Sequence, residues 1–253
     1  MLSSDTDLSR NWFTQGGAAY ARFRPDYPPQ LHAFLASLSP ANSIALDVGC
    51  GNGQLTLGLA KHFTAVIGLD PSADQIAHAP RHKRINYLVA PAERIPLPEN
   101  SVDLITAAQA AHWFNLPAFY TEVRRVAIPG GALALTSYGV LELEPGLDER
   151  FSLFYHEEIG QYWPPQRKLV DMGYATIDFP FTEHPAPALE ISRRWDLAEL
   201  LGYLSTWSAV RQARDAGRQD ILQAFSREMS EAWGDSSDKR LVRWPVNMRI
   251  GRL

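Results

Sequence analysis

The sequence predicts an α/β fold in which a mostly parallel sheet carries helices on both faces. Up to about residue 139, short apolar runs alternate with segments that have the apolar spacing of helices. Polar residues do not alternate inside the runs, which is typical of strands buried on both faces of a parallel sheet. Ligands of such sheets bind beyond the carboxyl ends of the strands, so we expect the functional residues there.

The first three strands are separated by short helices. We predict strands at residues 43–49 (SIALDVG), 65–70 (AVIGLD) and 85–90 (INYLVA). A helix should begin near Gly53, because LTLGLAKHF has amphipathic spacing. Ser72 can accept a hydrogen bond from a free backbone N–H and so cap the helix after the second strand.

Two further strands complete the first half. They are predicted at residues 102–110 (VDLITAAQA) and 131–138 (GALALTSY). The segment NLPAFYTEVRRVA between them indicates a helix, with Asn115 as its cap and Pro117 in its first turn. The run Pro-Gly-Gly at 129–131 should stop this helix.

After residue 139 aromatic residues become dense. We predict a helix at 151–163 ended by two prolines, an extended stretch at 175–195, and one helix at 196–217 closed by a glycine. A further helix should cover 220–233 and a last strand 242–253; the locally basic residues 239–253 favour a surface edge of a strand. Residues 1–139 are thus assigned to an N-terminal cap helix and the ligand-binding core. Residues 140–253 are assigned to cap helices and sheet-completing strands of the same domain.

Composition narrows the possible partners. The formal net charge of −4 argues against a dedicated nucleic-acid binder, which is normally basic. Cys50 is the only cysteine, which excludes an intrachain disulfide and paired-cysteine metal sites. There is no signal-peptide core, and no apolar run approaches the roughly 20 residues that cross a bilayer. We expect a cytoplasmic protein with no metal, membrane or nucleic-acid partner; the sequence does not indicate its oligomeric state.

The stretch LDVGCGNGQ, residues 46–54, is a glycine-rich turn between a strand and a helix. Its spacing is GxGxG, whereas dinucleotide sites have GxGxxG, and Asp47 in its rim is unfavourable beside a phosphate. A ligand with an ammonium group and no phosphate suits it better, because Asp47 can meet the amine directly or through water. Helix N–H groups near Gly53 can receive a carboxylate. S-adenosylmethionine carries such an amino-acid group.

Other strand ends supply positions in the expected order. Asp70 closes the second strand, where an acid can accept both ribose hydroxyls. Ala92 and Glu93 follow the third strand and can border an adenine. Gln109 and Ala110 end the fourth strand, beneath the same ligand.

The stretches LDVGCGNGQ, IGLDPS and PAERIPLPENSVDLITAAQAAHWF, with the strand after PGG, together resemble class I S-adenosylmethionine-dependent methyltransferases. The resemblance is closest to the small-molecule branch that includes trans-aconitate methyltransferases, whose N-terminal signature is similar to FTQGGAAYARFRPDYP. It covers most of residues 13–138 and is diffuse beyond them. It implies a Rossmann-like fold with a seven-stranded sheet and a helical cap. It also implies cofactor contacts at Asp47, Gly49, Gly51, Asp70, Pro71, Ala92, Glu93 and Gln109, with Trp113 beside the cofactor and Tyr20 and Arg24 closing over its methionine end.

Several of these residues have a second interpretation. His112, just after the fourth strand, can act as a general base or be a loop histidine bonded to the main chain. Arg24 can hold the cofactor carboxylate or pair with Asp26, and Asp70 can cap the following helix. Cys50 is interpreted as a small loop residue and Asp103 as structural. Beyond residue 139, pocket and core roles are equally compatible with His156, Tyr203, Trp207 and Arg211.

The predicted function is methyl transfer from S-adenosylmethionine to a small organic molecule. The resemblance suggests a carboxylic acid, and the aromatic second half is also compatible with a hydrophobic natural product. A base-amino methyltransferase of nucleic acid is disfavoured, because QAAHWF stands where [DNS]PP[YFW] is typical. Two alternatives remain: a non-catalytic S-adenosylmethionine sensor, and an NAD-dependent dehydrogenase, which the glycine spacing and Asp47 disfavour.

Overall fold

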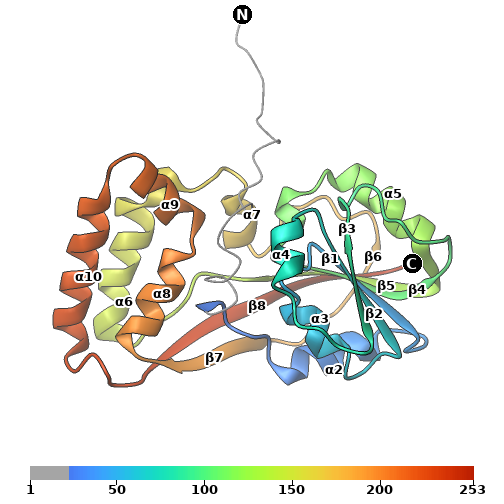
Figure 1. The fold of residues 1–253 in the computed structure, drawn as a ribbon, viewed down its shortest axis with the longest axis horizontal. Coiled ribbons are helices and arrows are strands. Elements are labelled where there is room, and N and C mark those ends of the chain that lie inside the picture. Colours follow the sequence, from blue (N-terminus) through green and yellow to red (C-terminus); the bar gives the residue numbers. More distant parts are fainter. Residues whose placement is uncertain (1–22) are drawn as a thin grey trace, which may run out of the picture.

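The molecule consists of an α/β lobe and a helical lobe. The computed structural model describes residues 23–253, so the predicted site residue Tyr20 lies outside the described residues. In Figure 1 the α/β lobe is at the right and the helical lobe at the left. The long strand β8 (Arg240–Arg252) runs from one lobe into the other.

Within residues 23–253 the sheet has eight strands, one more than the seven that the family resemblance implies. The path β3-β2-β1-β4-β5-β8-β6 contains seven of them, and β7 pairs with β8 beside it. The five strands from β3 to β5 are parallel, whereas β6, β7 and β8 are antiparallel to their neighbours. The prediction of a mostly parallel sheet is confirmed. The strands before β8 are β1 (Ile44–Val48), β2 (Ala65–Asp70), β3 (Ile85–Val89), β4 (Val102–Ala108), β5 (Ala127–Tyr138), β6 (Thr182–His184) and β7 (Leu189–Trp195).

Helices cover both faces of the parallel part. Leu31 of α2 (Pro29–Ser37) and Leu59 of α3 (Gln54–Leu59) share one core cluster with Ala45 of β1. Phe119 of α5 (Leu116–Val126) shares the other cluster with Leu46, the next residue of β1. Successive side chains of a strand point to opposite faces, so the continuous apolar run of β1 follows from burial on both sides.

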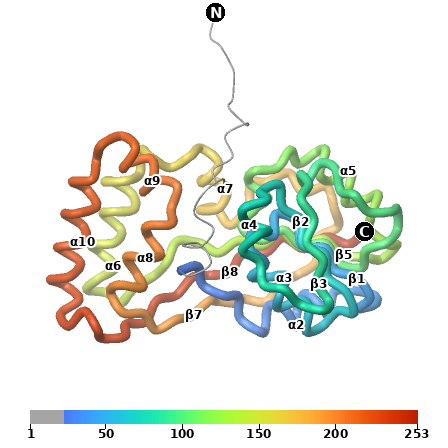
Figure 2. Tube along the Cα trace, viewed as in Figure 1, coloured from blue at the N-terminus to red at the C-terminus, as the bar shows by residue number. Residues whose placement is uncertain are grey.

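The helical lobe is built from α6 (Pro145–Leu153), α8 (Leu197–Ser205), α9 (Ser208–Asp215) and α10 (Gln219–Trp233), as Figure 2 also shows. Helix α6 continues into a π-helical turn at Phe154–Glu158, which replaces the uniform helix predicted there. Helices α4 (Ala73–Ala77) and α7 (Arg167–Asp171) lie at the side of the α/β lobe that faces the helical lobe (Figure 1), and a 3-10 turn at Ala111–Trp113 contacts α7.

Two predictions for the second half are wrong. The predicted helix 196–217 is divided between α8 and α9, because the chain turns at Thr206 and buries Trp207 in an aromatic cluster. The basic last strand is not at an edge, since β8 lies between β5 and β6. Its arginines are accommodated by partners; the Nε of Arg249, for example, donates to Glu183 at 2.7 Å.

Candidate active site

The glycine loop turns sharply at the carboxyl end of β1, next to the end of β4. Gly49 has φ +67°, and a Cβ there would lie 2.4 Å from the Cβ of Ala110. Gly53 has φ +84° and is the N-cap residue of α3, close to the Tyr87 hydroxyl. Positive φ and close approach both require glycine. The predicted strand-to-helix turn is confirmed, and its walls include Ala110, which follows β4, and Tyr87 of β3.

Asp47 lies inside the protein, beneath this loop. Its side chain accepts hydrogen bonds from Thr56 Oγ1 at 2.6 Å and from Thr106 Oγ1 at 2.9 Å. The residue is 1% exposed, and burial raises the pKa of its carboxyl to about 6. The sequence analysis placed this acid in the rim of the ligand site, whereas the structure places it below the glycine loop. A buried carboxylate needs hydrogen-bond donors, and here α3 and β4 supply them. Its contact with a cofactor remains a prediction.

Asp70 braces the loop from the end of β2. Its two carboxylate oxygens accept from the backbone N–H groups of Gly51 and Ser72, each at 2.8 Å. Burial raises the pKa of Asp70. Ser72, as predicted, caps α4 by accepting from the N–H of Gln75. Ser72 therefore caps the helix, and Asp70 holds the loop. Each carboxylate oxygen of Asp70 can accept a further hydrogen bond, and a ribose hydroxyl would bind there.

Buried polar atoms without hydrogen-bond partners surround the loop. Among the described residues, the side-chain amide of Asn52 and the Oε1 of Gln75 have no partner. Apart from the neighbours of Gly51 in the chain, the Gln75 Oε1 is also the one atom of the described residues within 4 Å of the position that a Cβ on Gly51 would take, at 3.8 Å. Buried polar groups normally have partners. The loop therefore has open space and unused bonding capacity, which fit a ligand with amino-acid and ribose groups.

The remaining predicted cofactor residues lie along the same edge of the sheet. Glu93 Oε1 accepts from the N–H of Asn115 at 2.8 Å, and Ala92 is buried. Gln109 adopts φ +53° and donates from Nε2 to the carbonyl of Tyr138 at 2.9 Å. Pro71 is exposed at the turn after β2. The structure thus brings these residues to the carboxyl ends of neighbouring strands, as expected.

His112 lies in the 3-10 turn after β4, between two aromatic rings. The ring of Trp113 is 4.8 Å away between centroids, and Nδ1 of His112 is 2.9 Å from the hydroxyl of Tyr174. Burial, with a smaller contribution from the charge of Arg167, lowers the pKa of His112 to about 3. The imidazole is therefore neutral at physiological pH. One interpretation of His112 was a loop histidine bonded to the main chain. The structure shows a side-chain partner, the phenol of Tyr174.

Arg24 connects the glycine-loop side of the molecule with the helical lobe. Its Nε donates to Thr206 Oγ1 at 3.1 Å, and its Nη1 donates to the Tyr138 hydroxyl at 2.9 Å. Its guanidinium lies 5.2 Å from the centroid of the Tyr203 ring. Gln54, the first residue of α3, donates to its carbonyl at 3.3 Å. This position is compatible with the predicted role of closing over a ligand.

Arg167 of α7 is a second cation at the same place, and the sequence analysis missed it. Its Nε donates to Tyr155 Oη at 2.9 Å and Asp171 Oδ1 at 2.8 Å, and its guanidinium lies 4.7 Å from the Trp163 ring centroid. Burial and the Tyr138 phenol raise the pKa of Tyr203, while the charges of Arg24 and Arg167 act to lower it. Both arginines therefore act on one phenol between the lobes.

The indole of Trp163 lies beside Arg167, and the indole of Trp207 packs against Trp163. The Nε1 atoms of Trp163 and Trp207 are both buried; that of Trp163 has no hydrogen-bond partner among the described residues, whereas that of Trp207 is near the Tyr203 hydroxyl and acts to lower the pKa of that phenol. The two rings are 5.2 Å apart between centroids, and Trp207 is 2% exposed. Unpartnered buried donors are unfavourable. The Trp163 N–H and the guanidinium of Arg167 form a pair of donors suited to an anion.

Other candidates have mainly structural surroundings. Burial raises the pKa of the Cys50 thiol, so it is not an activated nucleophile. Asp103 Oδ2 accepts from the N–H of Ile44 at 2.6 Å, which joins β4 to β1. Arg211 lies on α9, one turn after Trp207. His156 lines a separate cavity.

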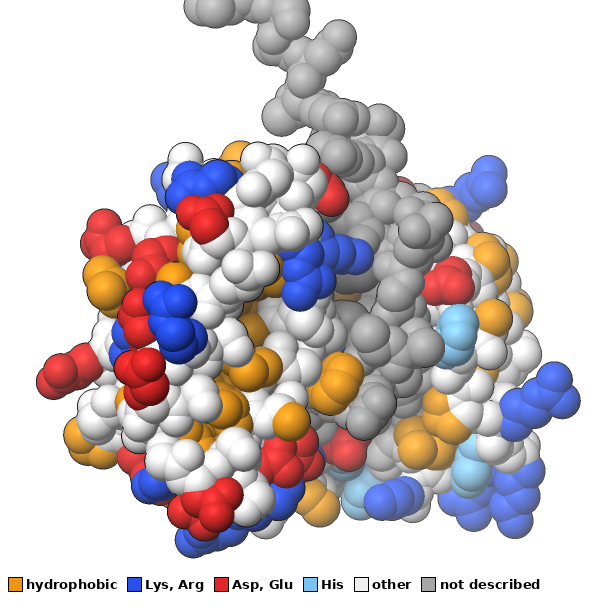
Figure 3. All heavy atoms as spheres, turned by 60° about the vertical axis from the view of Figure 1, so that its left-hand side comes forward, with side chains coloured by type: hydrophobic (Ala, Val, Ile, Leu, Met, Phe, Trp, Pro, Cys, Tyr) orange, Lys and Arg blue, Asp and Glu red, His pale blue; other side chains and the backbone are white. Residues whose placement is uncertain are grey.

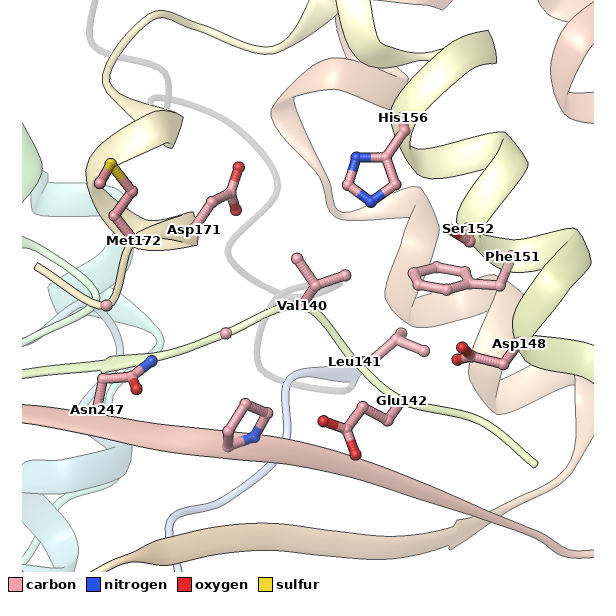
Figure 4. Close-up of a pocket in the computed structure, with 13 residues that line it drawn as sticks. Val140, Leu141, Glu142, Asp148, Phe151, Ser152, His156, Asp171, Met172 and Asn247 are labelled. Carbon is pink, nitrogen blue, oxygen red and sulfur yellow. The ribbon is translucent and has the colours of Figure 1, made fainter. Parts of the chain in front are cut away.

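That cavity, of about 520 Å³, opens between α6 and α7 above β8 (Figure 4). Asp171 and Met172 lie on one side, His156 lies on the other, and Asn247 lies on the floor. The described residues that line it include three carboxylates and no lysine or arginine. It is therefore a poor site for an anion.

The exposed side chains of the helical lobe show no single dominant charge on the face seen in Figure 3, where acidic and basic groups are intermixed. Within residues 23–253, no helix is long and apolar enough to cross a membrane. The same residues contain no cluster of histidine, cysteine and acidic side chains that could hold a metal ion.

Comparison with known proteins agrees with this architecture. The family model described as a methyltransferase domain matches residues 46–135. A Dictyostelium discoideum protein whose name assigns it to the methyltransferases is 36% identical over 241 residues, which cover 92% of each chain. A solved structure from Anaeromyxobacter dehalogenans, named as a candidate type II methyltransferase, is 46% identical and covers 91% of this chain and 98% of that chain, with a TM-score of 0.85.

A more distant relative carries a cofactor in its name. It is a Saccharomyces cerevisiae protein named for S-adenosylmethionine-dependent methyl transfer, 31% identical over 48% of this chain and 45% of its own length. The match is thus confined to about half of either protein.

Proposed function

The chain belongs to the class I S-adenosylmethionine-dependent methyltransferases, and we propose that it methylates a carboxylate of a small organic acid. Membership of this family excludes the dehydrogenase alternative. The observation that carries the choice of acceptor is the pair of donors formed by the guanidinium of Arg167 and the unpartnered indole of Trp163. A carboxylate can accept from both, since guanidinium and indole N–H groups are donors only.

The cofactor side of the site consists of the glycine loop and the strand ends around it. The free N–H groups at the start of α3 suit the cofactor carboxylate, and the unpartnered atoms of Asn52 and Gln75 add polar contacts. The acids at the strand ends, Asp47 and Asp70, hold the loop in shape. S-adenosylmethionine supplies a methyl group activated by its sulfonium charge.

The residues between the lobes would align the acceptor and exclude water. A small organic acid is ionised at neutral pH, so its oxygen is nucleophilic without loss of a proton. Arg24 and Arg167 offset its charge, and the surrounding rings of Trp163, Trp207 and Tyr203 keep the site dry. Alignment and desolvation then provide most of the rate acceleration.

A labelled-methyl assay tests this proposal. The purified protein is incubated with S-adenosylmethionine carrying a labelled methyl group and with mono-, di- and tricarboxylic acids, each matched by its neutral amide. We expect label in one or more acids as a methyl ester, which alkali releases as methanol, and none in the amides. Label only in acceptors without a carboxylate, or cofactor binding without any turnover, as for a sensor, would contradict the proposal.

A further inference from the structure

Tyr174 holds His112 from the side of α7. Its hydroxyl lies 2.9 Å from His112 Nδ1, and the residue is fully buried at 0% exposure. Helix α7 contacts the 3-10 turn that carries His112. The sequence offers no motif that joins these two residues, which are 62 positions apart.

The phenol proton has a single described acceptor. Hydrogen bonding from the backbone amides of His112 and Ala111 acts to lower the pKa of Tyr174, whereas burial, the largest contribution, raises it. The phenol therefore keeps its proton. A buried hydroxyl must also place its own hydrogen on an acceptor. Nδ1 of His112 is the acceptor that the described residues provide.

We infer that Tyr174 donates to Nδ1 and so fixes His112 in the tautomer that carries its proton on Nε2. A neutral imidazole has one N–H and one lone pair, and here the lone pair is occupied by Tyr174. His112 can then donate a hydrogen bond from Nε2 to a substrate oxygen, but it cannot remove a proton through that atom. The hydrogen bond of His112 to a described side chain is made through Nδ1, which leaves Nε2 for a ligand.

This role matches the chemistry of a carboxylate acceptor, and only this step rests on the proposed function. One carboxylate oxygen forms the new bond to the methyl carbon while the carbon–sulfur bond breaks and its electron pair remains on sulfur. No proton moves, so no general base is required. A donor such as Nε2–H orients the acid by binding an oxygen of the carboxylate.

The backbone around Tyr174 is held in an unusual conformation. Gly173 and Tyr174 have φ values of +59° and +65° in succession, and the second is unfavourable for a residue with a side chain. The Nη1 of Arg249 donates to the Tyr174 carbonyl at 3.1 Å, and the N–H of Tyr174 donates to the Leu169 carbonyl at 2.8 Å. Such strain persists where surrounding contacts require it, and it is frequent at functional sites.

Nitrogen NMR of the histidine side chains tests the tautomer without any substrate. The chain has seven histidines, and the spectrum of His112→Gln identifies the His112 signals by their loss. We expect an unprotonated Nδ1 and a protonated Nε2 in the unmodified protein at neutral pH. Tyr174→Phe should convert His112 to a mixture of tautomers. Tyr120→Phe is the matched control, because it removes another buried hydroxyl, whose partner is the Asp178 carbonyl. A proton on Nδ1 of the unmodified protein, or no change in Tyr174→Phe, would overturn the inference.

Kinetics separate a donor from a base. Glutamine places an N–H near the position of Nε2, so His112→Gln should keep kcat within about tenfold of the unmodified value, whereas His112→Ala should lose about a hundredfold. Equal losses in both variants would indicate a base and contradict the inference. If no carboxylic acid is methylated at all, the proposed function fails while the NMR result still decides the tautomer.

Discussion

The carboxylates of Asp47 and Asp70 hold the glycine loop from inside the protein, because each accepts two hydrogen bonds from the chain around it. The cost is burial of charge, which raises the pKa of both groups. These hydrogen bonds show that the two carboxylates shape the loop. Whether they also contact a cationic group of the ligand is a separate role, which stays a prediction.

The pH dependence of stability should report the burial of Asp47. Its pKa is about 6 in the folded protein and 3.8 as an ordinary value, so the folded state binds the proton more tightly. The contribution of Asp47 to stability therefore increases as pH falls from 7 toward 4. The difference in unfolding free energy between the unmodified protein and Asp47→Asn should rise by about 1 kcal/mol from pH 7 to pH 5.

Urea unfolding of both proteins at the two pH values measures this difference. His32 and His112, whose pKa values burial lowers to about 4 and about 3, favour the opposite trend, but they occur in both proteins and cancel. A difference that is constant with pH would show that Asp47 titrates normally.

The glycine loop makes a prediction about cofactor affinity. Gly51→Ala adds a methyl group at φ +54° in the cradle, where the main chain must approach the ligand. Gly130→Ala is the matched control, with φ +79° and no atom within 4 Å, away from the site. By calorimetry, Gly51→Ala should lose about tenfold or more in S-adenosylmethionine affinity, and Gly130→Ala should bind like the unmodified protein. Equal affinities would place the cofactor elsewhere.

Arg167 should control the binding of the acid more than the chemical step. Arg167→Met keeps the bulk of the side chain but removes the charge, so KM for the acid should rise by about thirtyfold, or about 2 kcal/mol. Arg124→Met removes an exposed arginine that also lies over an aromatic ring, Phe181 at 4.5 Å, but on α5. Steady-state kinetics of the two variants should differ in KM. An unchanged KM in Arg167→Met would remove Arg167 from the substrate site.

At the scale of elements, α2 and α3 pack through a glycine. A Cβ on Gly58 would lie 2.0 Å from Nε2 of His32, which is 7% exposed. The short helix α3 therefore approaches α2 at a distance that only glycine allows. This contact positions α3, whose first turn borders the glycine loop.

Paired variants test that packing. Gly58→Ala should cost about 2 kcal/mol of unfolding free energy, because the methyl group overlaps the imidazole. In the His32→Ala background the ring is absent, so the same substitution should cost little or nothing. Urea denaturation of the four proteins gives the coupling energy. Equal costs in the two backgrounds would mean that the helices separate easily.

Across the whole molecule, one core joins the two lobes. The larger core cluster extends from Leu59 of α3 through Trp244 of β8 to Phe225 of α10. Strand β8 pairs with β5 in the α/β lobe and with β7 toward the helical lobe. Because apolar burial is continuous across the lobes, neither has a core of its own on this face, and we expect them to unfold together.

Two probes in different lobes test this cooperativity. Cys50, the only cysteine, is buried in the α/β lobe and reacts with a thiol reagent only when that lobe opens. Tryptophan fluorescence reports mainly on the helical lobe and on β7 and β8, since Trp113 is the one described tryptophan that lies elsewhere. The two denaturation curves should have the same midpoint. Thiol labelling at a lower denaturant concentration than the fluorescence change would show independent lobes.

The parallel sheet, the glycine turn, the helix caps at Ser72 and Asn115 and the positions at the strand ends were predictable from the sequence. Each depends on residues close together in the chain: apolar runs, glycines that permit positive φ, and side chains that bond to their own helix. The carboxyl end of a strand is likewise a local property, so the residues that gather there could be named in advance.

Tertiary structure alone decided the rest. The burial of Asp47 under Thr56 and Thr106, the approach of Arg167 to the site and the contact of Tyr174 with His112 join residues from separate elements. The position of β8 between β5 and β6, and the division of the predicted helix before Trp207, could not be predicted from the sequence either. Hydrogen bonds, charge and desolvation act between neighbours in space, and such neighbours are set by how the elements pack, which no local pattern of residues records.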